Sequence, residues 1–427
     1  MSIIRNGLLS ADLDVPVVLP TLNLDFANSQ ELDPRITFTR GSIGIFVNRN
    51  GLIETIAANQ PRFDFDPISG ECKGLLIEES RVNLLTYSNT FTNGIWNSSS
   101  VTRTDNVITS PDGTINAGLI SNSGSTFGGL LRQYYTFSAI PYTFSCFVKK
   151  INWRYIGIRI AGSLVADNFY PVFDLDTKTF ITNSVTGITL SYQEFPNGWY
   201  RISLTYTPTA GSSVIDIALV PANGDHFSRQ GQGVCSAYVY GAQLEAGAFP
   251  TSYIPTVAST VTRSADLASM TGTNFSSWYN SSEGTLFVVA SPSTNGAYSG
   301  FIYLLGTDFN NGIVYLRQSD YQPVFRIRSG QRDEYSKAIN GAVGFGQIWR
   351  NAVALKSAIS FKTNDFNSFV SGVPITGSRA TAGTLPTFTG PLYLGGLNGS
   401  AYLNGTISRL TYYPKALSPS QLQYLTQ

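Results

Sequence analysis

Short segments in which apolar and polar residues alternate recur along the chain. In one of them Ile156, Ile158 and Ile160 are separated by Gly157 and Arg159. Residues 202–206 and 215–219 repeat this pattern. A period of two places alternate side chains on opposite faces, which is typical of a strand with one face buried. These segments predict half-buried β-strands.

Tight turns separate the predicted strands. The dipeptide Asn-Gly occurs ten times, from Asn6-Gly7 to Asn404-Gly405. Both of its residues tolerate the positive φ angles of two-residue hairpin turns. One such hairpin is predicted for residues 45–53, around Asn50-Gly51. Helical patterns are nearly absent, except near the carboxyl end, where residues 418–421 (SPSQ) form a capping box with proline at the first turn.

Changes in pattern divide the chain into four segments. Residues 1–85 are punctuated by proline and predict a small, hairpin-rich amino-terminal module. Residues 86–260 carry evenly spaced strands, which favours a two-sheet β-sandwich. Residues 261–281 are polar and weakly patterned and predict a linker, and residues 282–427 predict a second sandwich. The expected fold class is all-β, with two tandem β-sandwiches preceded by the small module.

Composition removes several classes of function. The 427 residues carry a formal net charge of +1 without a cluster of Lys and Arg, so we expect no binding to nucleic acid and no membrane insertion. Cys72, Cys146 and Cys235 lie far apart, without the spacing of a zinc or redox site, and are expected to be small buried hydrophobes. The first residues contain no apolar stretch, so we expect a soluble protein made without a signal peptide.

Three phrases near the amino end resemble a known module. They are residues 38–40 (FTR), 59–64 (NQPRFD) and 73–85 (KGLLIEESRVNLL). Together they are similar to the amino-terminal module of many bacteriophage tail-fibre and other virion structural proteins. The usual family phrase has Thr where Val82 stands here.

The rest of the chain resembles lectin-like domains. Residues 142–149 (YTFSCFVK), 197–202 (NGWYRI) and 240–255 (YGAQLEAGAFPTSYIP) look like a carbohydrate-binding-module-like jelly roll. Residues 392–396 (LYLGG), 405–407 (GTI) and 418–425 (SPSQLQYL) look like a concanavalin A-like sandwich of the laminin-G type. The resemblance implies a jelly roll followed by a concanavalin A-like domain.

The resemblance also implies a function and partners. It points to a non-enzymatic structural protein of a bacteriophage virion, in a tail, fibre or other surface appendage, that is made in the host cytoplasm. The expected partners are other virion proteins, host cell-surface polysaccharide, and further copies of the same chain in a homotrimer. A purely structural capsid or baseplate protein with lectin-like spacers is the alternative, and a capsule depolymerase is a third possibility. No cofactor is expected.

Glycan cleavage would require two carboxylates across a sugar-sized cleft, roughly 5 to 9.5 Å apart. The sequence offers three close pairs: Asp64 with Asp66, Glu78 with Glu79, and Asp174 with Asp176. Each has a structural interpretation as a turn or a local ion pair, and no catalytic residue is assigned. Arg62, Asp64, Glu78, Glu79 and Arg81 are instead interpreted as contacts that dock one module on another.

Other reactive groups are few. His226 is the only histidine and lies in a polar loop without a nearby nucleophile motif, so a serine or cysteine hydrolase is not expected. No metal is assigned, although Asp308 and Asn310 carry oxygens suited to calcium. The same residues are also compatible with a simple Asn-Gly hairpin.

Sugar recognition needs an aromatic face and a few hydrogen-bonding groups. In the middle segment, the candidates are Trp153, Tyr155, Asn168 and Tyr170. In the last segment, the candidates are Tyr303, Asn310, Tyr315, Arg317 and Tyr321. For each aromatic residue, a position in the core or in a subunit contact remains the alternative. Trp199, which opens a strand, is expected to be a packing residue.

Overall fold

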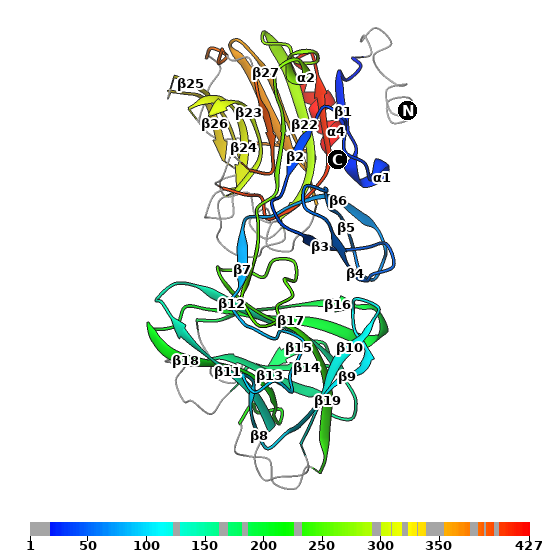
Figure 1. The fold of residues 1–427 in the computed structure, drawn as a ribbon. Coiled ribbons are helices and arrows are strands. Elements are labelled where there is room, and N and C mark those ends of the chain that lie inside the picture. Colours follow the sequence, from blue (N-terminus) through cyan, green and yellow to red (C-terminus); the bar gives the residue numbers. More distant parts are fainter. Residues whose placement is uncertain are drawn as a thin grey trace.

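The computed structural model describes residues 18–122, 129–161, 170–181, 187–225, 233–292, 300–308, 310–317, 323–330, 332–338, 354–375, 383–387, 390–396 and 401–427. Antiparallel strands dominate these ranges and form two stacked sandwiches, which confirms the predicted fold class (Figure 1). The helices are short, and none in these ranges is long and apolar enough to cross a membrane.

The middle sandwich contains two six-stranded sheets. The first, here the β12 sheet, runs in the order β16 (Thr189–Phe195), β17 (Trp199–Tyr206), β12 (Tyr142–Lys150), β19 (Cys235–Ala246), β10 (Ile115–Asn122) and β9 (Thr102–Thr109). The second, here the β18 sheet, runs in the order β15 (Thr179–Ile181), β14 (Val172–Asp174), β13 (Tyr155–Ile160), β18 (Gly211–Leu219), β11 (Gly129–Phe137) and β8 (Asn97–Ser99). A one-turn 3-10 helix, Pro196–Gly198, connects β16 to β17.

Alternation along the strands builds the core of the middle sandwich. Ile156, Ile158 and Ile160 of β13 point inward beside Ile215 and Ile217 of β18, and all five are fully buried. A fully buried isoleucine contributes roughly 1.5–3 kcal/mol relative to an exposed one. The residues between them face away from this core, which is what the sequence pattern predicted.

The last sandwich also contains two sheets. The β22 sheet has the order β29 (Val373–Pro374), β28 (Asp365–Val370), β27 (Leu355–Lys362), β22 (Glu283–Pro292), β31 (Gly405–Tyr413), β6 (Cys72–Ile77) and β5 (Phe63–Phe65), and β1 (Leu22–Leu24) pairs with β31 as well. The β24 sheet has the order β2 (Thr37–Thr39), β21 (Leu267–Met270), β30 (Leu392–Leu394), β23 (Gly300–Asp308), β24 (Asn311–Arg317), β25 (Pro323–Ser329) and β26 (Arg332–Ala338). The short helices α1 (Phe26–Ser29) and α2 (Thr273–Ser276) flank these sheets.

The predicted carboxyl-terminal helix is confirmed as α4 (Pro419–Thr426). The Ser418 hydroxyl accepts a hydrogen bond from the backbone N–H of Gln421, and the Gln421 side chain accepts one from the Ser418 N–H. Leu422 is fully buried and Leu425 half-buried against the β22 sheet. The helix is too short to be stable alone, so this docking stabilises it.

The amino-terminal segment is not a separate module, in contrast to the predicted boundary at residue 85. Its strands β1 and β6 pair with β31, and β2 pairs with β21. Leu22, Leu24, Phe26, Leu75 and Ile77 belong to the core of the last sandwich. Residues near both ends of the chain therefore build one sandwich, because strand pairing does not depend on separation along the sequence.

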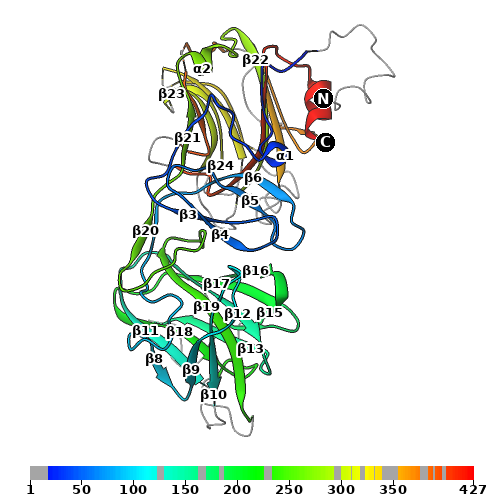
Figure 2. The same ribbon diagram turned by 45° about the vertical axis from the view of Figure 1, so that its right-hand side comes forward.

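The predicted linker, residues 261–281, is also structured. β20 (Val261–Arg263) pairs with β7 (Arg81–Asn83), and β21 pairs with both β2 and β30. Ala268 and Met270 point into the core, but the strand is too short for its alternating pattern to stand out in the sequence. The middle sandwich is thus an insertion, and β7 (labelled in Figure 1) and β20 (labelled in Figure 2) are the two paired strands through which the chain enters and leaves it.

The predicted hairpin forms from β3 (Gly44–Val47) and β4 (Ile53–Ile56). Ile45, Val47 and Ile53 pack on the outer face of the β12 sheet, against the following residues: Phe147, Phe195, Trp199, Tyr240 and Tyr253. At the turn, Gly51 has a φ of 75°, and a Cβ there would lie 2.2 Å from the carbonyl oxygen of Pro67. The hairpin therefore attaches the two sandwiches to each other, and Trp199 packs in this contact.

A buried ion cluster, here the joint cluster, lies where the sandwiches meet. It consists of Arg40, Arg62, Glu78, Arg263 and Asp266, all at most 4% exposed. Asp266 accepts hydrogen bonds from Arg40 Nη1 (3.1 Å) and from Arg62 Nη2. Oε2 of Glu78 lies 2.8 Å from Arg62 Nη1 and 3.5 Å from Arg263 Nη2. Arg40, Arg62 and Glu78 come from the first segment of the chain, and Arg263 and Asp266 come from the predicted linker.

Glu78 also reaches the middle sandwich. Its carboxylate accepts hydrogen bonds from the backbone N–H and the hydroxyl of Ser252, each 2.7 Å long. Burial alone would raise the pKa of Glu78, but the charges of Arg263 and Arg62 and the bonds from Ser252 outweigh it and hold the pKa at about 2. Glu78 is therefore ionised and fixed at neutral pH.

The other docking residues nominated from the sequence lie nearby. Arg81 donates to Glu79 (2.6 Å) and to the carbonyl oxygen of Ala246, and its guanidinium lies 4.6 Å from the ring centroid of Phe249. Asp64 contacts its own segment instead, because it accepts from the Val47 N–H at 2.8 Å and pairs with Lys73. Arg81 thus contacts the middle sandwich directly, whereas Asp64 fixes the β3–β4 hairpin.

The insertion can be tested by excision. Asn83 and Val261 lie opposite each other in the β7–β20 pair, so an Asn-Gly turn can join them in place of residues 84–260. We expect this fused chain to unfold cooperatively in urea, with a stability reduced by the exposure of Ile45, Val47 and Ile53. Residues 261–427 alone are expected to show no cooperative transition, because β1, β5 and β6 are missing from the β22 sheet. Cooperative unfolding of that fragment alone would contradict the shared sandwich.

The joint cluster predicts that the stability of the folded protein depends on pH in the acidic range. The folded pKa of Glu78 lies below its ordinary value near 4.5, so the unfolded chain binds more protons and stability rises with pH. This contribution, about 3 kcal/mol, is complete above pH 4.5 and is lost as the pH falls toward 2. We expect Glu78→Gln to flatten the pH dependence of the urea midpoint in that window. Glu71→Gln, which replaces an exposed carboxylate, is the control and should leave the slope nearly unchanged.

Candidate functional site

The outer face of the β18 sheet carries a charged cluster at its centre. Arg132 of β11, Asp216 of β18 and Arg159 of β13 lie side by side in register across three neighbouring strands. Their neighbours along each strand point into the core, so these three side chains share the opposite face. Tyr170, which precedes β14, covers the same face close to Gly157. We call these four residues the Asp216 cluster.

Asp216 is completely buried and is the acceptor for the whole cluster. Arg132 donates to it through Nε at 2.7 Å and Nη2 at 3.0 Å, in a two-pronged arrangement. Arg159 donates through Nε at 3.0 Å and Nη2 at 2.6 Å, and the Tyr170 hydroxyl donates at 2.9 Å. A single carboxylate thus orients two guanidinium groups and one phenol.

The electrostatics follow from this arrangement. The hydrogen bonds to Asp216 raise the pKa of Arg132 above its already high value. Burial, reinforced by the negative charge of Asp216, raises the pKa of Tyr170 well above 10, so its hydroxyl stays protonated and acts as a donor. Arg132 and Arg159 both place a positive charge beside this carboxylate. The cluster suits hydroxyl groups or a negatively charged group of a ligand.

Part of this face is open to solvent. The Arg132 side chain is 25% exposed and Tyr134, two residues further along β11, is 62% exposed. Residues two apart in a strand point to the same side. An exposed aromatic ring therefore lies beside a guanidinium that is held in place from below. This is the combination that sugar recognition requires.

The structure brings Tyr155 and Tyr170 of the predicted middle-segment residues to this face, and Trp153 lies beside Tyr155 while also packing against the core between the sheets. Tyr170 is buried in an apolar cluster with Val220, and Tyr155 packs against that cluster. Trp153 contacts Tyr155 edge-on, with ring centroids 5.8 Å apart, and its Nε1 donates to the carbonyl oxygen of Val220 at 2.9 Å. Tyr170 is too buried to stack on a ligand, so its function here is to position Asp216. Asn168 lies outside the described residues.

Arg132, Tyr134, Arg159 and Asp216 were missed as site residues in the sequence. Arg159 and Asp216 did stand out there as charged residues between isoleucines. A charge at the outward position of a strand is common, however, and only the pairing of β11, β18 and β13 shows that three such positions are neighbours.

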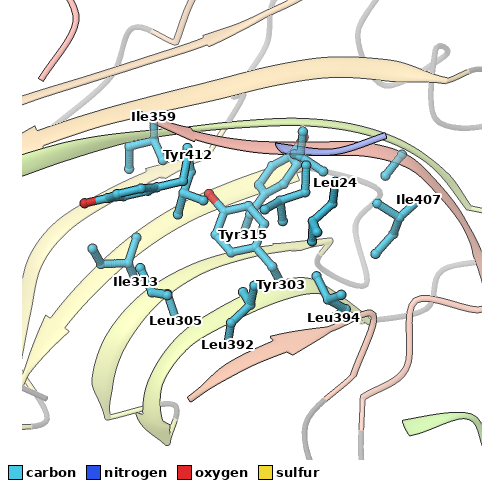
Figure 3. Packing of buried hydrophobic residues seen from close by; sticks show 14 of the residues in the cluster. Leu24, Tyr303, Leu305, Ile313, Tyr315, Ile359, Leu392, Leu394, Ile407 and Tyr412 are labelled. Carbon is cyan, nitrogen blue, oxygen red and sulfur yellow. The ribbon is translucent and has the colours of Figure 1, made fainter. Parts of the chain in front are cut away.

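The structure does not support a glycan site at Tyr303 and Tyr315, two of the candidates of the last segment. Tyr303 and Tyr315 are at most 1% exposed and point into the core between the two sheets, where burial raises the pKa of both (Figure 3). Side chains at these two positions of the strands point inward, so neither ring is available to a sugar. The Tyr315 hydroxyl instead shares a hydrogen bond with Ser357, 2.7 Å away.

The remaining candidates of this segment are placed only in part. Asn310 is exposed, and its side-chain oxygen Oδ1 accepts a hydrogen bond from Arg328 Nη1 at 2.8 Å. The side chains of Asp308 and Arg317, together with Tyr321 and His226, lie outside the described residues. Within the described part of the chain, no group of three or more His, Cys, Asp or Glu is arranged to hold a metal ion.

The carboxylate pairs considered for glycan cleavage have structural contacts. Asp174 accepts from Arg154, and the pKa of Asp174 is lowered to about 2, since the bonds from Arg154, the Asp176 N–H and Thr177 outweigh its burial. Asp176 pairs with Lys150 at 2.7 Å. Asp66 accepts from two backbone N–H groups in a turn, at 3.0 and 2.8 Å. Glu78 and Glu79 belong to the joint described above.

Comparison with known proteins gives only distant similarities. No family model and no curated protein matches the chain. Among solved structures, it is similar to the Ruminococcus gnavus IT-sialidase CBM40, including complexes with α2,3- and α2,6-sialyllactose, at 16–18% identity and a TM-score of 0.29. These matches cover 35% of this chain and 84–85% of the CBM40 chains.

A second group of similar structures is that of Trypanosoma rangeli sialidase. The identity is 10–11%, the TM-scores are 0.27–0.29, and the matches cover 72% of this chain and 60–61% of the sialidase. The similarities are thus to glycan-binding and sialidase β domains. The prediction of a non-enzymatic protein is not upheld by this comparison, in which sialidases are among the similar structures. At these scores, they assign neither an activity nor a ligand to this chain.

The Asp216 cluster predicts that substitution of Asp216 destabilises the protein more than substitution of a half-exposed aspartate of the same sandwich. Asp216→Asn should lower the free energy of unfolding by about 3–5 kcal/mol, because it leaves two guanidinium groups without their buried counter-charge. Asp176→Asn, at a half-exposed ion pair of the same sandwich, is the control and should cost less than about 1 kcal/mol. Urea denaturation followed by tryptophan fluorescence measures both. Equal losses would show that Asp216 does not organise this face.

Proposed function

We propose that this chain binds glycans through the open part of the β18 sheet face, and that it does so as a surface appendage of a bacteriophage virion. The ligand surface consists of Tyr134 and Arg132, supported by Asp216, Arg159 and Tyr170. The juxtaposition of an exposed ring and a fixed guanidinium is the observation that carries the proposal. A pyranose can stack its apolar face on the ring while its hydroxyl or carboxylate groups accept hydrogen bonds from the guanidinium.

Rigidity of the site supports this function. Binding costs side-chain entropy when flexible groups must be ordered. The hydrogen bonds from Arg132 Nε and Nη2 to Asp216 are already formed, and the Tyr134 side chain also contacts Arg132. The guanidinium is therefore held in place before a ligand binds. The site is therefore preorganised for an oxygen-rich ligand.

The virion assignment is supported by sequence resemblance. Residues 38–40, 59–64 and 73–85 carry the phrases shared with phage structural proteins, and they lie in β2, β5, β6 and β7 or next to them. Since these strands fold with the last sandwich, we assign attachment to other virion proteins to that sandwich as a whole. The middle sandwich, inserted at the other end, then faces the host polysaccharide.

Assembly into a homotrimer is part of the proposal. A shallow site on one chain binds weakly, but linking identical sites raises overall avidity by about 10²–10⁴-fold without new contacts. The rigid joint between the sandwiches would also suit a second function, that of a structural spacer in a capsid or baseplate with no ligand. The two functions differ in whether any host polysaccharide binds.

Binding of purified host surface polysaccharides and of a glycan array tests the proposal. For the glycan that binds, Tyr134→Ala should weaken affinity about 3- to 10-fold, through the loss of stacking. Arg132→Met should weaken it about 10-fold or more, through the loss of charge-assisted hydrogen bonds. Tyr424→Ala, which removes an exposed tyrosine of α4, is the matched control and should have no effect.

The outcomes separate the alternatives. Binding that is unchanged in both variants would place the glycan site elsewhere on the chain. Absence of binding to every host polysaccharide would favour the spacer. Chromatography of the polysaccharide after incubation shows whether its chains are shortened, which distinguishes binding alone from binding with cleavage.

A further inference from the structure

The outer face of the β12 sheet is unusually regular beyond the area covered by the β3–β4 hairpin. Three rows of side chains cross β16, β17 and β12 in register. From one end of the sheet to the other, the rows are Thr189–Thr205–Thr143, Ser191–Ser203–Ser145 and Gln193–Arg201–Phe147. The hydroxyl groups bond to each other across the strands, at 2.7 Å between Thr143 and Thr205 and 2.6 Å between Ser191 and Ser203.

Arg201, in the third row, differs from the other arginines of this region. Its Nη2 donates to the Ser145 hydroxyl at 3.0 Å, and its guanidinium lies 5.5 Å from the ring centroid of Phe147. No carboxylate of the described residues lies within 4.0 Å of it, and its buried Nε has no hydrogen-bond partner there. Desolvation lowers the pKa of Arg201, an effect that the more distant charge of Glu245 opposes. A guanidinium in such surroundings is normally paired.

The neighbouring carboxylates are committed to other groups. Glu245 is fully buried and accepts hydrogen bonds from the N–H and the hydroxyl of Thr251. Glu78 is bound to Arg62 and Ser252, and Asp266 to Arg40 and Arg62. Arg81 is matched by Glu79. Arg40, Arg62 and Arg263 therefore share two carboxylates, which leaves a positive charge in excess in the described part of the joint, and Arg201 is the arginine there that forms no ion pair.

The side chains around Arg201 are hydrogen-bonding groups of the type that complement an oxyanion. Gln193 lies directly beside it on β16 and is half-buried. Within the described part of the chain, the Gln193 amide forms no hydrogen bond of its own. Ser191 and Ser203 follow in the next row, and Ser191 and Arg201 are both half-buried, so a small ligand can reach this place from the edge strand β16.

We propose that Arg201, with Gln193 and the serine row, binds an oxyanion: a carboxylate, sulfate or phosphate group. The Nε–H and an Nη–H of one guanidinium are parallel and match two oxygens of such a group. The bound anion neutralises the excess charge and satisfies the buried Nε. This site lies on the opposite sheet from the Asp216 cluster and does not depend on the glycan-binding proposal.

Titration of the whole protein with oxyanions tests the proposal. The probes are sodium acetate, glucuronate, sulfate and phosphate, each balanced with sodium fluoride to constant ionic strength at pH 7. We expect the Tm of the wild-type chain to rise by roughly 2–4 °C and to saturate with concentration. In ¹H–¹⁵N spectra, the Nε–H resonance that disappears in Arg201→Lys should move during the same titration.

Variants distinguish the site from general salt effects. Arg201→Lys removes the planar pair of donors but keeps the charge, and this variant should lose at least two thirds of the Tm shift. Gln193→Ala should reduce the Tm shift. Arg132→Met removes a residue of the other site, and the Tm shift that persists in this variant belongs to the Arg201 site, so failure of the glycan proposal and failure of this one are separable. A larger response to glucuronate than to acetate identifies an acidic sugar as the source, and equal responses identify a small free anion.

The proposal is overturned by either of two results. In the first, none of the four anions changes the Nε–H resonance or the Tm of the wild-type protein. Ser145 and Phe147 would then satisfy Arg201 without a ligand. The other is an Arg201→Lys chain that responds like the wild type. The spectra of the wild-type protein give the answer even where a variant is too unstable to purify.

Discussion

The fold depends on one constraint: the buried charges of the joint must remain paired. Arg62 contacts both Glu78 and Asp266, and these two carboxylates are otherwise held by Arg40, Arg263 and Ser252. Removing any member leaves a charge without its partner in a low-dielectric interior, which costs far more than the pairing gains. The cluster therefore allows one relative placement of the early strands, the inserted sandwich and the strand that follows it. Well-packed apolar residues could give equal stability, but would fix this placement less specifically.

That placement gives the two faces of the middle sandwich different properties. The β12 sheet receives the β3–β4 hairpin over its aromatic residues, and this covers much of its outer face. Within the described ranges, no element of the first segment covers the β18 sheet in this way, and Tyr134 and Arg132 are accessible on it. The buried carboxylate of Asp216 is costly unless it is fully hydrogen-bonded, and the arginines that satisfy it become the organised part of the surface. A requirement of folding thus prepares a possible site of recognition.

The candidate site was only partly predictable from the sequence. Trp153, Tyr155 and Tyr170 were predicted as glycan-binding aromatics of the middle segment, and Tyr155 and Tyr170 do lie on one face, with Trp153 in contact with Tyr155. Arg132, Arg159 and Asp216 come from strands that are far apart in the sequence, so their proximity depends on the strand order β13–β18–β11. In the last segment, the same reasoning failed for Tyr303 and Tyr315, because alternation shows that two faces exist without showing which one faces the core. The docking residues Arg62 and Glu78 could be suspected from their charge in an apolar setting, although their partner Asp266 could not.

Local chemistry along the chain was enough to determine the class of the fold. Asn-Gly turns, a period of two and a capped terminal helix each act over a few residues, and hairpin β3–β4 and helix α4 form where these signals stand. Only the tertiary structure decided that residues 22–83 complete the last sandwich, that residues 261–281 are part of it, and that the middle sandwich is an insertion. The physical reason is that strand pairing uses backbone groups that all residues share. Partners far apart in sequence are therefore chosen by the burial and charge pairing of the whole chain.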